Sequence, residues 1–260
     1  MEGCRGKGEG EREHEDIMSI QDPLPPSPFP LPPSLSPLIS IVVPVLDDLA
    51  AAEQLLARLA PDARVEVIVV DGGHDRGLDR LARSRSGVRL IRSRRGRAIQ
   101  MNAGAATARG EWLLFLHADS ALPENWVDVF ERDTSDARGG WFRFALDDPS
   151  WQARTIERGV ALRVRVLRLP YGDQGLFVRR TVFAALGGYK EMPLMEDVEF
   201  VRRLVSGGQL VQLPVALVTS ARRWRRDGWI RRSAGNLLLL ALYKAGVSPA
   251  RLARLYTNSY

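Results

Sequence analysis

Cysteine and histidine are scarce in this chain of 260 residues, which contains one cysteine and three histidines. The single cysteine, Cys4, excludes an intramolecular disulfide framework and a zinc site built from several thiolates. The histidines lie far apart in the sequence and show no spacing typical of metal ligands. Any metal ion would therefore be held mainly by oxygen ligands.

Long apolar runs are also missing, and the C-terminal run Leu237–Tyr243 has only seven apolar residues. A helix that spans a bilayer needs roughly 20 such residues. Arginines precede this run and further basic residues follow it. It is therefore expected to form either an interfacial helix beside anionic lipid or a helix that packs in the core or in a dimer. We expect a cytoplasmic protein, which in the first case is peripheral at the inner face of the membrane.

The chain is rich in basic charge, but this charge is unevenly distributed. The net charge is +6, yet residues 1–38 contain seven acidic and three basic side chains, so residues 39–260 carry +10. The first 38 residues also hold eight of the sixteen prolines. Such a segment is expected to be a disordered, acidic and proline-rich extension. Residues 39–260 then form one domain, whose basic surplus suits an anionic partner such as a phosphorylated substrate, anionic lipid or nucleic acid.

Strand-like and helix-like segments alternate from residue 39 onward. Runs rich in β-branched or other apolar residues predict strands at 39–45, 64–70, 88–92 and 111–116, and helices at 49–59, 78–84, 97–107 and 123–132. Alternation with short connections predicts an α/β fold, a doubly wound and mostly parallel sheet with helices on both faces. Ligands of such sheets bind beyond the carboxyl ends of the strands, which here lie after Val45, Val70 and Leu116.

The second half of the chain predicts a less regular pattern. Strands are expected at 140–146, 175–179 and 209–218, and helices at 151–169, 181–186, 197–206 and 237–245. No internal repeat and no second linker interrupts this part.

Carboxylates follow two of the predicted strands and begin one predicted helix. Asp71 is followed by two glycines, so it can bind a base or ribose or simply cap a turn. Asp119 lies two residues after His117 and can hold a divalent cation or cap the next helix. Glu196 and Asp197 can act as a base or as ordinary caps at a helix N-terminus.

Two basic segments could bind a diphosphate. Arg94, Arg95 and Arg97 precede a helix, which makes this segment either an anion site or a solvated loop. Residues 222–226 (RRWRR) follow a strand, and Trp224 offers an aromatic face for a sugar or base. The alternative for that second segment is a basic surface that meets nucleic acid or lipid.

Seven segments follow one another in a distinctive order: 41–48 (IVVPVLDD), 67–73 (VIVVDGG), 96–105 (GRAIQMNAGA), 115–120 (FLHADS), 171–179 (YGDQGLFVR), 195–200 (MEDVEF) and 219–224 (TSARRW). Taken in this order they resemble a family 2 glycosyltransferase of the GT-A fold, over about residues 39–256. The stretches GRAIQMN, LHAD and YGDQG resemble the bacterial subgroup of arsenosugar-biosynthesis or selenodomain-associated glycosyltransferases.

The resemblance implies a set of site residues for a nucleotide-sugar. Asp119 matches the last carboxylate of the family's DXD motif, with Ala118 before it and His117 in place of the first aspartate, a departure that weakens the metal site or changes its preference. Asp197 matches the catalytic base, with Glu196 beside it. The remaining implied residues are Pro44, Val45, Asp71, Arg97 and Asn102 around the nucleotide, Gly172, Asp173 and Gln174 around the donor sugar or acceptor, and Arg223 and Trp224 near the diphosphate.

The implied activity is inverting transfer of a sugar from a nucleotide donor to an acceptor hydroxyl, with Mg²⁺ or Mn²⁺ as cofactor. UDP is the expected nucleotide, because it is common in the family. A nucleotidyltransferase is an alternative, but it would usually carry a Gly- and Lys-rich loop where this chain has residues 44–47 (PVLD). A basic protein that binds nucleic acid or lipid without catalysis is another. No usual recognition motif supports a nucleic-acid partner, so none is expected.

Overall fold

The computed structural model describes residues 38–259 of the chain. Apart from Leu38, the acidic extension expected at residues 1–38 lies outside the described residues.

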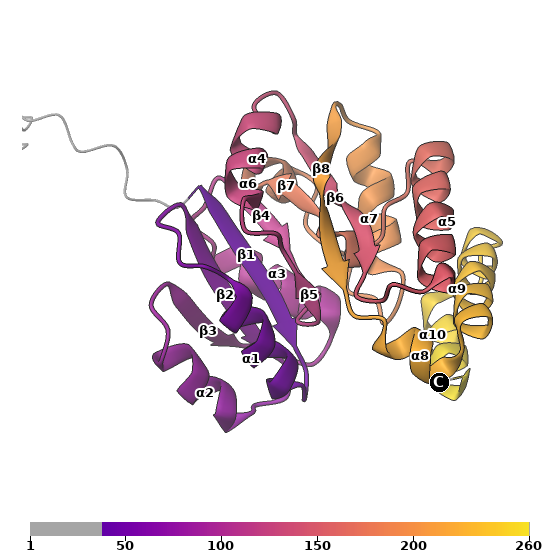
Figure 1. Cartoon of the computed structure of the whole chain (residues 1–260), viewed down its shortest axis with the longest axis horizontal. Helices are drawn as coiled ribbons and strands as arrows, with labels where there is room; N and C mark the ends of the chain where they lie inside the picture. Colours follow the sequence, from indigo (N-terminus) through magenta and orange to yellow (C-terminus); the bar gives the residue numbers. More distant parts are fainter. Residues whose placement is uncertain (1–37, 260) are drawn as a thin grey trace, which may run out of the picture. The chain divides into compact units, whose positions relative to one another are not determined.

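One eight-stranded sheet organises the described part of the chain, in the order β3-β2-β1-β4-β7-β6-β8-β5 (Figure 1). Strands β3, β2, β1 and β4 are mutually parallel, as are β6 and β8, whereas β7 and β5 run antiparallel to their neighbours. The sheet is thus mostly parallel, as predicted. Its strands are β1 (Ile39–Val45), β2 (Val65–Asp71), β3 (Val88–Arg92), β4 (Trp112–Phe115), β5 (Ser120–Ala121), β6 (Gly139–Leu146), β7 (Phe177–Arg179) and β8 (Leu210–Thr219).

Helices cover both faces of this sheet. They are α1 (Leu49–Arg58), α2 (Arg76–Arg83), α3 (Arg97–Thr107), α4 (Trp126–Asp133), α5 (Trp151–Leu167), α6 (Arg180–Ala185), α7 (Glu196–Val205), α8 (Arg222–Asp227), α9 (Trp229–Lys244) and α10 (Pro249–Ser259), with a short 3-10 turn at Gly172–Gln174.

The period-two pattern of the central strands explains the two layers. In β1, Ile41 and Val43 join a core cluster that includes residues of α1, α2 and α4, whereas Val42 joins a cluster with α3, α6 and α7. Successive side chains point to opposite faces of a strand, so an uninterrupted apolar strand must be covered on both sides. The prediction of helices on both faces is confirmed.

The C-terminal part differs most from the sequence expectation. The helix expected at 237–245 begins at Trp229, and the basic run 222–226 lies in a separate helix, α8. Gly228, with φ 86°, separates the two helices. Helix α9 begins earlier than expected and includes Arg232, whose buried side chain pairs with Asp227 at 2.8 Å. Strand β5 and helix α10 were not expected. Among the described residues, no helix is both long and apolar enough to span a membrane.

Two helical glycines provide a matched test of the packing. An added Cβ at Gly104 in α3 would lie 2.4 Å from Cγ1 of Val42, whereas one at Gly159 in α5 would meet nothing within 4 Å. We expect Gly104→Ala to destabilise the fold by about 1–3 kcal/mol through overpacking. Gly159→Ala should stabilise it by about 0.5–1 kcal/mol, because alanine is the better helix former. Urea unfolding of both variants measures this; equal effects would contradict the packing of α3 on β1.

Candidate functional site

Two adjoining cavities lie beyond the carboxyl ends of β1 and β4. The larger has a volume of about 470 Å³ and the smaller about 150 Å³. Pro44, Val45 and Ala118 line only the larger cavity, and Asp173, Asp197 and Trp224 line only the smaller. The predicted site residues that line both are Arg97, His117, Asp119, Glu196 and Arg223. The structure therefore brings most of the predicted site residues together.

The centre of this arrangement is an ion-pair cluster between α3 and α7. Nε of Arg97 lies 3.1 Å from Oε1 of Glu196, and Nη2 lies 3.8 Å from Oδ2 of Asp197. The same Oδ2 accepts a hydrogen bond of 2.8 Å from the backbone N–H of Gly172. One guanidinium thus contacts both carboxylates, and the backbone N–H groups of Gly172 and Val198 hold that of Asp197.

Gly172 is required by close approach. An added Cβ there would lie 2.1 Å from Nη2 of Arg97, and 3.3 Å from both Oδ2 of Asp197 and Nε2 of His117. Only a residue without a side chain lets the guanidinium, the carboxylate and the imidazole converge on this backbone. Met195, immediately before α7, has φ 69°, an uncommon left-handed conformation for a residue other than glycine.

Burial shifts the acidity of three groups at the site. Burial raises the pKa of Asp173 to about 6, and the charge of Asp197 adds to this while Arg163 opposes it. Burial also raises the pKa of Glu196, with Asp197 adding to the effect and Arg97 opposing it. The pKa of His117 is lowered well below its ordinary value by burial and by the positive charges of Arg97 and Arg223. The His117 imidazole is therefore neutral at pH 7.

Asp119 and His117 fit a divalent cation only in part. Among residues 38–259, no three His, Cys, Asp or Glu side chains gather as a metal cage. The carboxylate of Asp119 faces both cavities and lies 3.9 Å from Nη2 of Arg222. Nε2 of His117 is buried without a hydrogen-bond partner. These two side chains would hold a cation here, and phosphate oxygens and water would have to complete its shell.

Asp71 is placed differently from the cavity residues. It is fully buried at the end of β2, and its Oδ1 accepts hydrogen bonds from the backbone of Gly73 (2.8 Å) and His74 (2.9 Å). Its Oδ2 has no hydrogen-bond partner among the described residues. This oxygen lies 3.9 Å from Nε of Arg92, an ion pair beyond hydrogen-bond distance, and Asp71 does not line either cavity.

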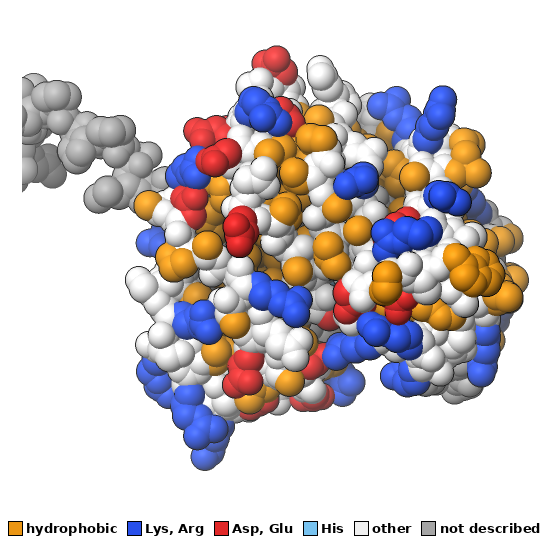
Figure 2. Space-filling view, in the orientation of Figure 1, with side chains coloured by type: hydrophobic (Ala, Val, Ile, Leu, Met, Phe, Trp, Pro, Cys, Tyr) orange, Lys and Arg blue, Asp and Glu red, His pale blue; other side chains and the backbone are white. Residues whose placement is uncertain are grey.

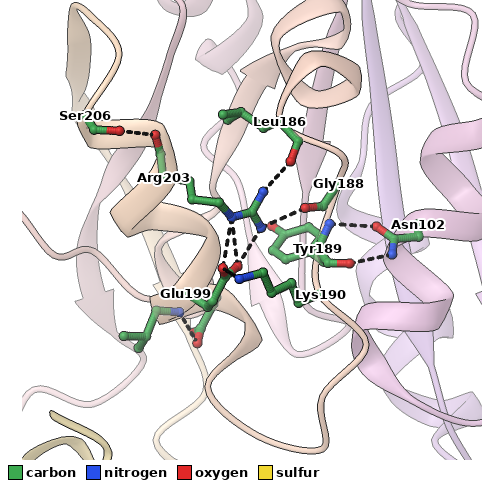
Figure 3. Close-up of polar contacts among 10 residues, drawn as sticks. Asn102, Leu186, Gly188, Tyr189, Lys190, Glu199, Arg203 and Ser206 are labelled. Carbon is green, nitrogen blue, oxygen red and sulfur yellow. Dashed lines mark hydrogen bonds and ion pairs between the residues drawn. The ribbon is translucent and has the colours of Figure 1, made fainter.

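Asn102 lies apart from both cavities and supports the chain that leads to α7. Its side-chain amide donates to the backbone oxygen of Tyr189 at 2.8 Å and accepts from the backbone N–H of Tyr189 at 2.9 Å (Figure 3). In the same network, Arg203 donates to the carbonyl of Gly188 and pairs with Glu199. In this conformation the polar atoms of Asn102 contact the backbone of Tyr189, not the region expected to hold ribose and diphosphate.

Trp224 is mainly a packing residue in this structure. Its side chain is buried with Phe144 and Leu146, and its indole N–H donates to Oγ of Ser233 at 3.3 Å. It borders the smaller cavity, but its neighbours leave it less open than the sequence suggested.

Sequence reasoning missed several residues of the site. Arg163 stacks on the ring of Tyr171 at 3.4 Å and donates to Oε1 of Gln174 at 3.2 Å, so α5 holds the 172–174 turn in place. Arg232 and Asn236 of α9 and Tyr256 of α10 line the smaller cavity. The signal in the sequence was the presence of polar residues within otherwise apolar C-terminal helices.

Comparison with known proteins decides what kind of domain this is. Residues 40–132 match the family described as glycosyl transferase family 2. The matched segment contains nearly all of β1, then β2 to β4 and the His117–Asp119 segment, whereas Asp173, Glu196 and Asp197 lie beyond it.

Two curated relatives are also named glycosyltransferases. Each is a "PGL/p-HBAD biosynthesis glycosyltransferase", one from Mycobacterium bovis and one from Mycobacterium tuberculosis, and each is 29% identical over 204 residues. The matches cover 68% of this chain and 73% of each relative. The chain is therefore a glycosyltransferase enzyme, and its assignment to the arsenosugar subgroup stays a prediction.

A solved structure supports the fold of the glycosyltransferase. It is a mannosyltransferase from Pyrobaculum calidifontis in complex with GDP-Man and Mn²⁺, with a TM-score of 0.61 and 19% sequence identity. The likeness covers 90% of this chain and 73% of that one. At this identity it shows the common GT-A-type fold, and the prediction of that fold is confirmed.

The raised pKa of Asp173 predicts how stability depends on pH. The folded-state pKa of about 6 exceeds that of an unfolded aspartate, so ionised Asp173 costs folding stability above about pH 6 and nothing below about pH 4. Asp173→Asn should therefore raise the free energy of unfolding at pH 8 by about 1–3 kcal/mol, with a higher melting temperature, and leave both unchanged at pH 4. An equal change at both pH values would contradict the buried charge.

Asp62 gives the matched control of opposite sign. Its hydrogen bond with Arg64 lowers its pKa, so its charge stabilises the fold above about pH 4. Asp62→Asn should destabilise the protein at pH 8, and the loss should shrink as the pH falls below about 4.

Proposed function

We propose that this glycosyltransferase moves a sugar from a nucleoside-diphosphate donor to an acceptor hydroxyl, with inversion at the anomeric carbon. The observation that carries the proposal is the Arg97–Glu196–Asp197 cluster, which lies where the larger and smaller cavities share a wall. The larger cavity would take the nucleotide and the smaller one the acceptor. Arg97, His117 and Asp119 border both, so the reacting atoms would meet there.

Asp197 is proposed as the general base. An acceptor hydroxyl is a weak nucleophile, so a carboxylate must take its proton as the oxygen attacks the anomeric carbon. Hydrogen bonds from the backbone of Gly172 and Val198, both 2.8 Å, fix the orientation of this carboxylate. As the new bond to the acceptor oxygen forms, the bond to the phosphate oxygen breaks, and the nucleoside diphosphate leaves with the electron pair. A single displacement of this kind inverts the anomeric centre.

Exposed arginines would stabilise the departing diphosphate. Arg95 and Arg223 line the larger cavity, and within residues 38–259 neither takes part in an ion pair. Arginine suits phosphate because its fork of N–H groups can donate two parallel hydrogen bonds. A bound divalent cation would neutralise developing charge on the phosphate oxygens, and Asp119 with His117 would hold it. The arginine-lined side of the larger cavity is therefore proposed to bind the departing nucleoside diphosphate.

The nucleotide of the donor is proposed to be UDP, on the family resemblance alone. The mannosyltransferase of similar fold was solved with GDP-Man and Mn²⁺, which makes GDP the principal competitor. Asp71 is the proposed partner of the base, because its buried Oδ2 accepts no hydrogen bond and has only the ion pair with Nε of Arg92 at 3.9 Å. An acceptor oxygen at this point would favour a base that presents an N–H group.

Conservative changes in the carboxylate pair should separate catalysis from binding. Asp197→Asn should lower the transfer rate by about 10²–10⁴-fold, because the amide cannot accept the proton. Glu196→Gln should have a smaller effect, since Glu196 is the more buried partner of Arg97. Glu191→Gln, at an exposed glutamate outside both cavities, is the matched control and should keep full rate. Donor turnover by chromatography and nucleotide binding by calorimetry measure these effects; full activity in Asp197→Asn would refute the assignment of the base.

A thermal-shift screen should identify the donor and the role of the cation. A ligand that binds only the folded protein raises the melting temperature, so UDP-, GDP- and dTDP-sugars are compared with and without Mn²⁺ or Mg²⁺. We expect the largest increase with a UDP-sugar and cation together. Asp119→Asn should remove the part of the increase that depends on the cation and keep the part due to nucleotide alone. An unchanged cation effect in this variant would show that Asp119 is not a ligand.

A further inference from the structure

Large exposed hydrophobic side chains are confined to one region of the described chain. Trp151 and Ile230 are the most exposed, at 73% and 83%. Within residues 38–256, whose side chains the structure describes, all eight such side chains lie on α5, α9 and α10: Trp151, Leu162, Val166, Leu167, Ile230, Leu237, Leu238 and Leu255. A concentration of this kind marks an interaction surface, whereas scattered single side chains would not.

The three helices that carry them pack together. Val164 of α5 and Leu240 of α9 belong to the same buried cluster, with Tyr243 packed against it. Arg232 of α9 donates to the hydroxyl of Tyr256 in α10 at 2.8 Å. Figure 1 shows α5, α9 and α10 side by side, next to α8, and Figure 2 shows hydrophobic and basic side chains interleaved over this region. We call the exposed sides of α5, α9 and α10 the C-terminal face.

The segments that form this face are strongly basic. Residues 222–260 contain nine basic residues and a single acidic one, Asp227, and residues 151–168 contain five arginines and one glutamate. Together their net charges of +8 and +4 exceed the +6 of the whole chain, so the rest of the protein is net acidic. The two acidic residues are already paired, Asp227 with Arg226 and Arg232, and Glu157 with Arg154.

Basic and apolar side chains alternate on the same side of α5. Arg158, Leu162 and Arg165 follow helical spacing of four and three residues, and all three are exposed. Within the described residues, Arg158, Arg165 and Arg168 take part in no ion pair. An apolar stripe flanked by free arginines can insert its side chains between lipid headgroups while the guanidinium groups stay at the charged surface.

We propose that the C-terminal face docks the protein on an anionic lipid bilayer. A second copy of this chain would bring an equally basic face against the first, and the two would repel each other. Nucleic acid would match the charge but offers no apolar layer for Leu162, Leu237 or Ile230. An anionic bilayer supplies both, a negative surface and a hydrocarbon layer beneath it.

Docking on this face would set the smaller cavity beside the membrane. Asn236 and Leu239 of α9 and Tyr256 of α10 line that cavity, so the helices that meet lipid also form part of its wall. The proposal does not depend on the assigned chemistry, because vesicle binding is measured without donor, acceptor or metal. Failure of vesicle binding would leave the glycosyltransferase assignment intact, and loss of catalysis would leave the docking face intact.

Flotation of the full chain with vesicles tests the proposal. We expect binding to vesicles of phosphatidylcholine with 30% phosphatidylglycerol, on the order of a hundredfold stronger than to phosphatidylcholine alone. Raising NaCl from about 0.1 M to about 0.5 M should weaken binding, because salt screens the surface charge. Absence of binding to the anionic vesicles, or equal binding to both compositions, would overturn the proposal.

Matched variants locate the surface. Replacing Arg158, Arg165 and Arg168 of α5 by glutamine should weaken binding on the order of a hundredfold. The control replaces three exposed arginines of α2, namely Arg76, Arg80 and Arg83, by glutamine, which removes the same charge from a different helix and should leave binding unchanged. Equal losses in both variants would show general charge attraction and would overturn the assignment to the C-terminal face.

The apolar contribution needs its own variant. Replacing Ile230, Leu237 and Leu238 by glutamine should weaken vesicle binding while light scattering shows the same oligomeric state as the parent. If the parent protein is a dimer that this change dissociates, and vesicle binding is unaffected, the face is a protein interface and the proposal is wrong. Because the three side chains are exposed, the melting temperature should stay near that of the parent and shows that each variant is folded.

Discussion

The site depends on one guanidinium that pairs with two adjacent carboxylates. Glu196 and Asp197 begin α7 in a largely buried position, where burial and mutual repulsion oppose the ionisation of Glu196. Arg97, at the first turn of α3, pairs with both and allows negative charge to persist there. A general base must be ionised to accept a proton, so the position of α3 against α7 is a chemical requirement as well as a packing arrangement.

The surrounding structure fixes these three side chains in relation to one another. Gly172 admits the guanidinium and binds Asp197 through its backbone, and Arg163 holds the turn that contains it. Asn102, one helical turn and a half beyond Arg97, binds the backbone of Tyr189, which leads toward α7. Helix α3 therefore supplies the guanidinium of Arg97 and, through Asn102, supports the segment that leads to the two carboxylates. Loss of either contact would move the base relative to the cavities.

The sequence predicts the first half of the fold well, because β1, β2 and β4 are apolar on both faces and alternate with helices. It predicts Arg97, Asp119, Glu196 and Asp197 as site residues through motifs that keep their local spacing. The sequence predicts the C-terminal helices poorly. Helix α9 includes the polar residue Arg232, which can be buried because it pairs with Asp227. Tyr256 was missed because its contact with Arg232 joins two different helices. Arg163 was missed because its contacts with Tyr171 and Gln174 depend on how the chain turns back after α5. Trp224 and Asn102 carry motif positions, yet their side chains pack within the protein.

The most direct test of the account is the anomeric configuration of the sugar that the enzyme releases. Proton NMR can follow slow transfer from the nucleotide-sugar to water, which needs no knowledge of the natural acceptor. If Asp197 activates the acceptor for a single displacement, the first sugar formed has the anomeric configuration opposite to that of the donor. A first product with the donor's own configuration would contradict the account, because retention requires a second displacement that a base at this position does not provide.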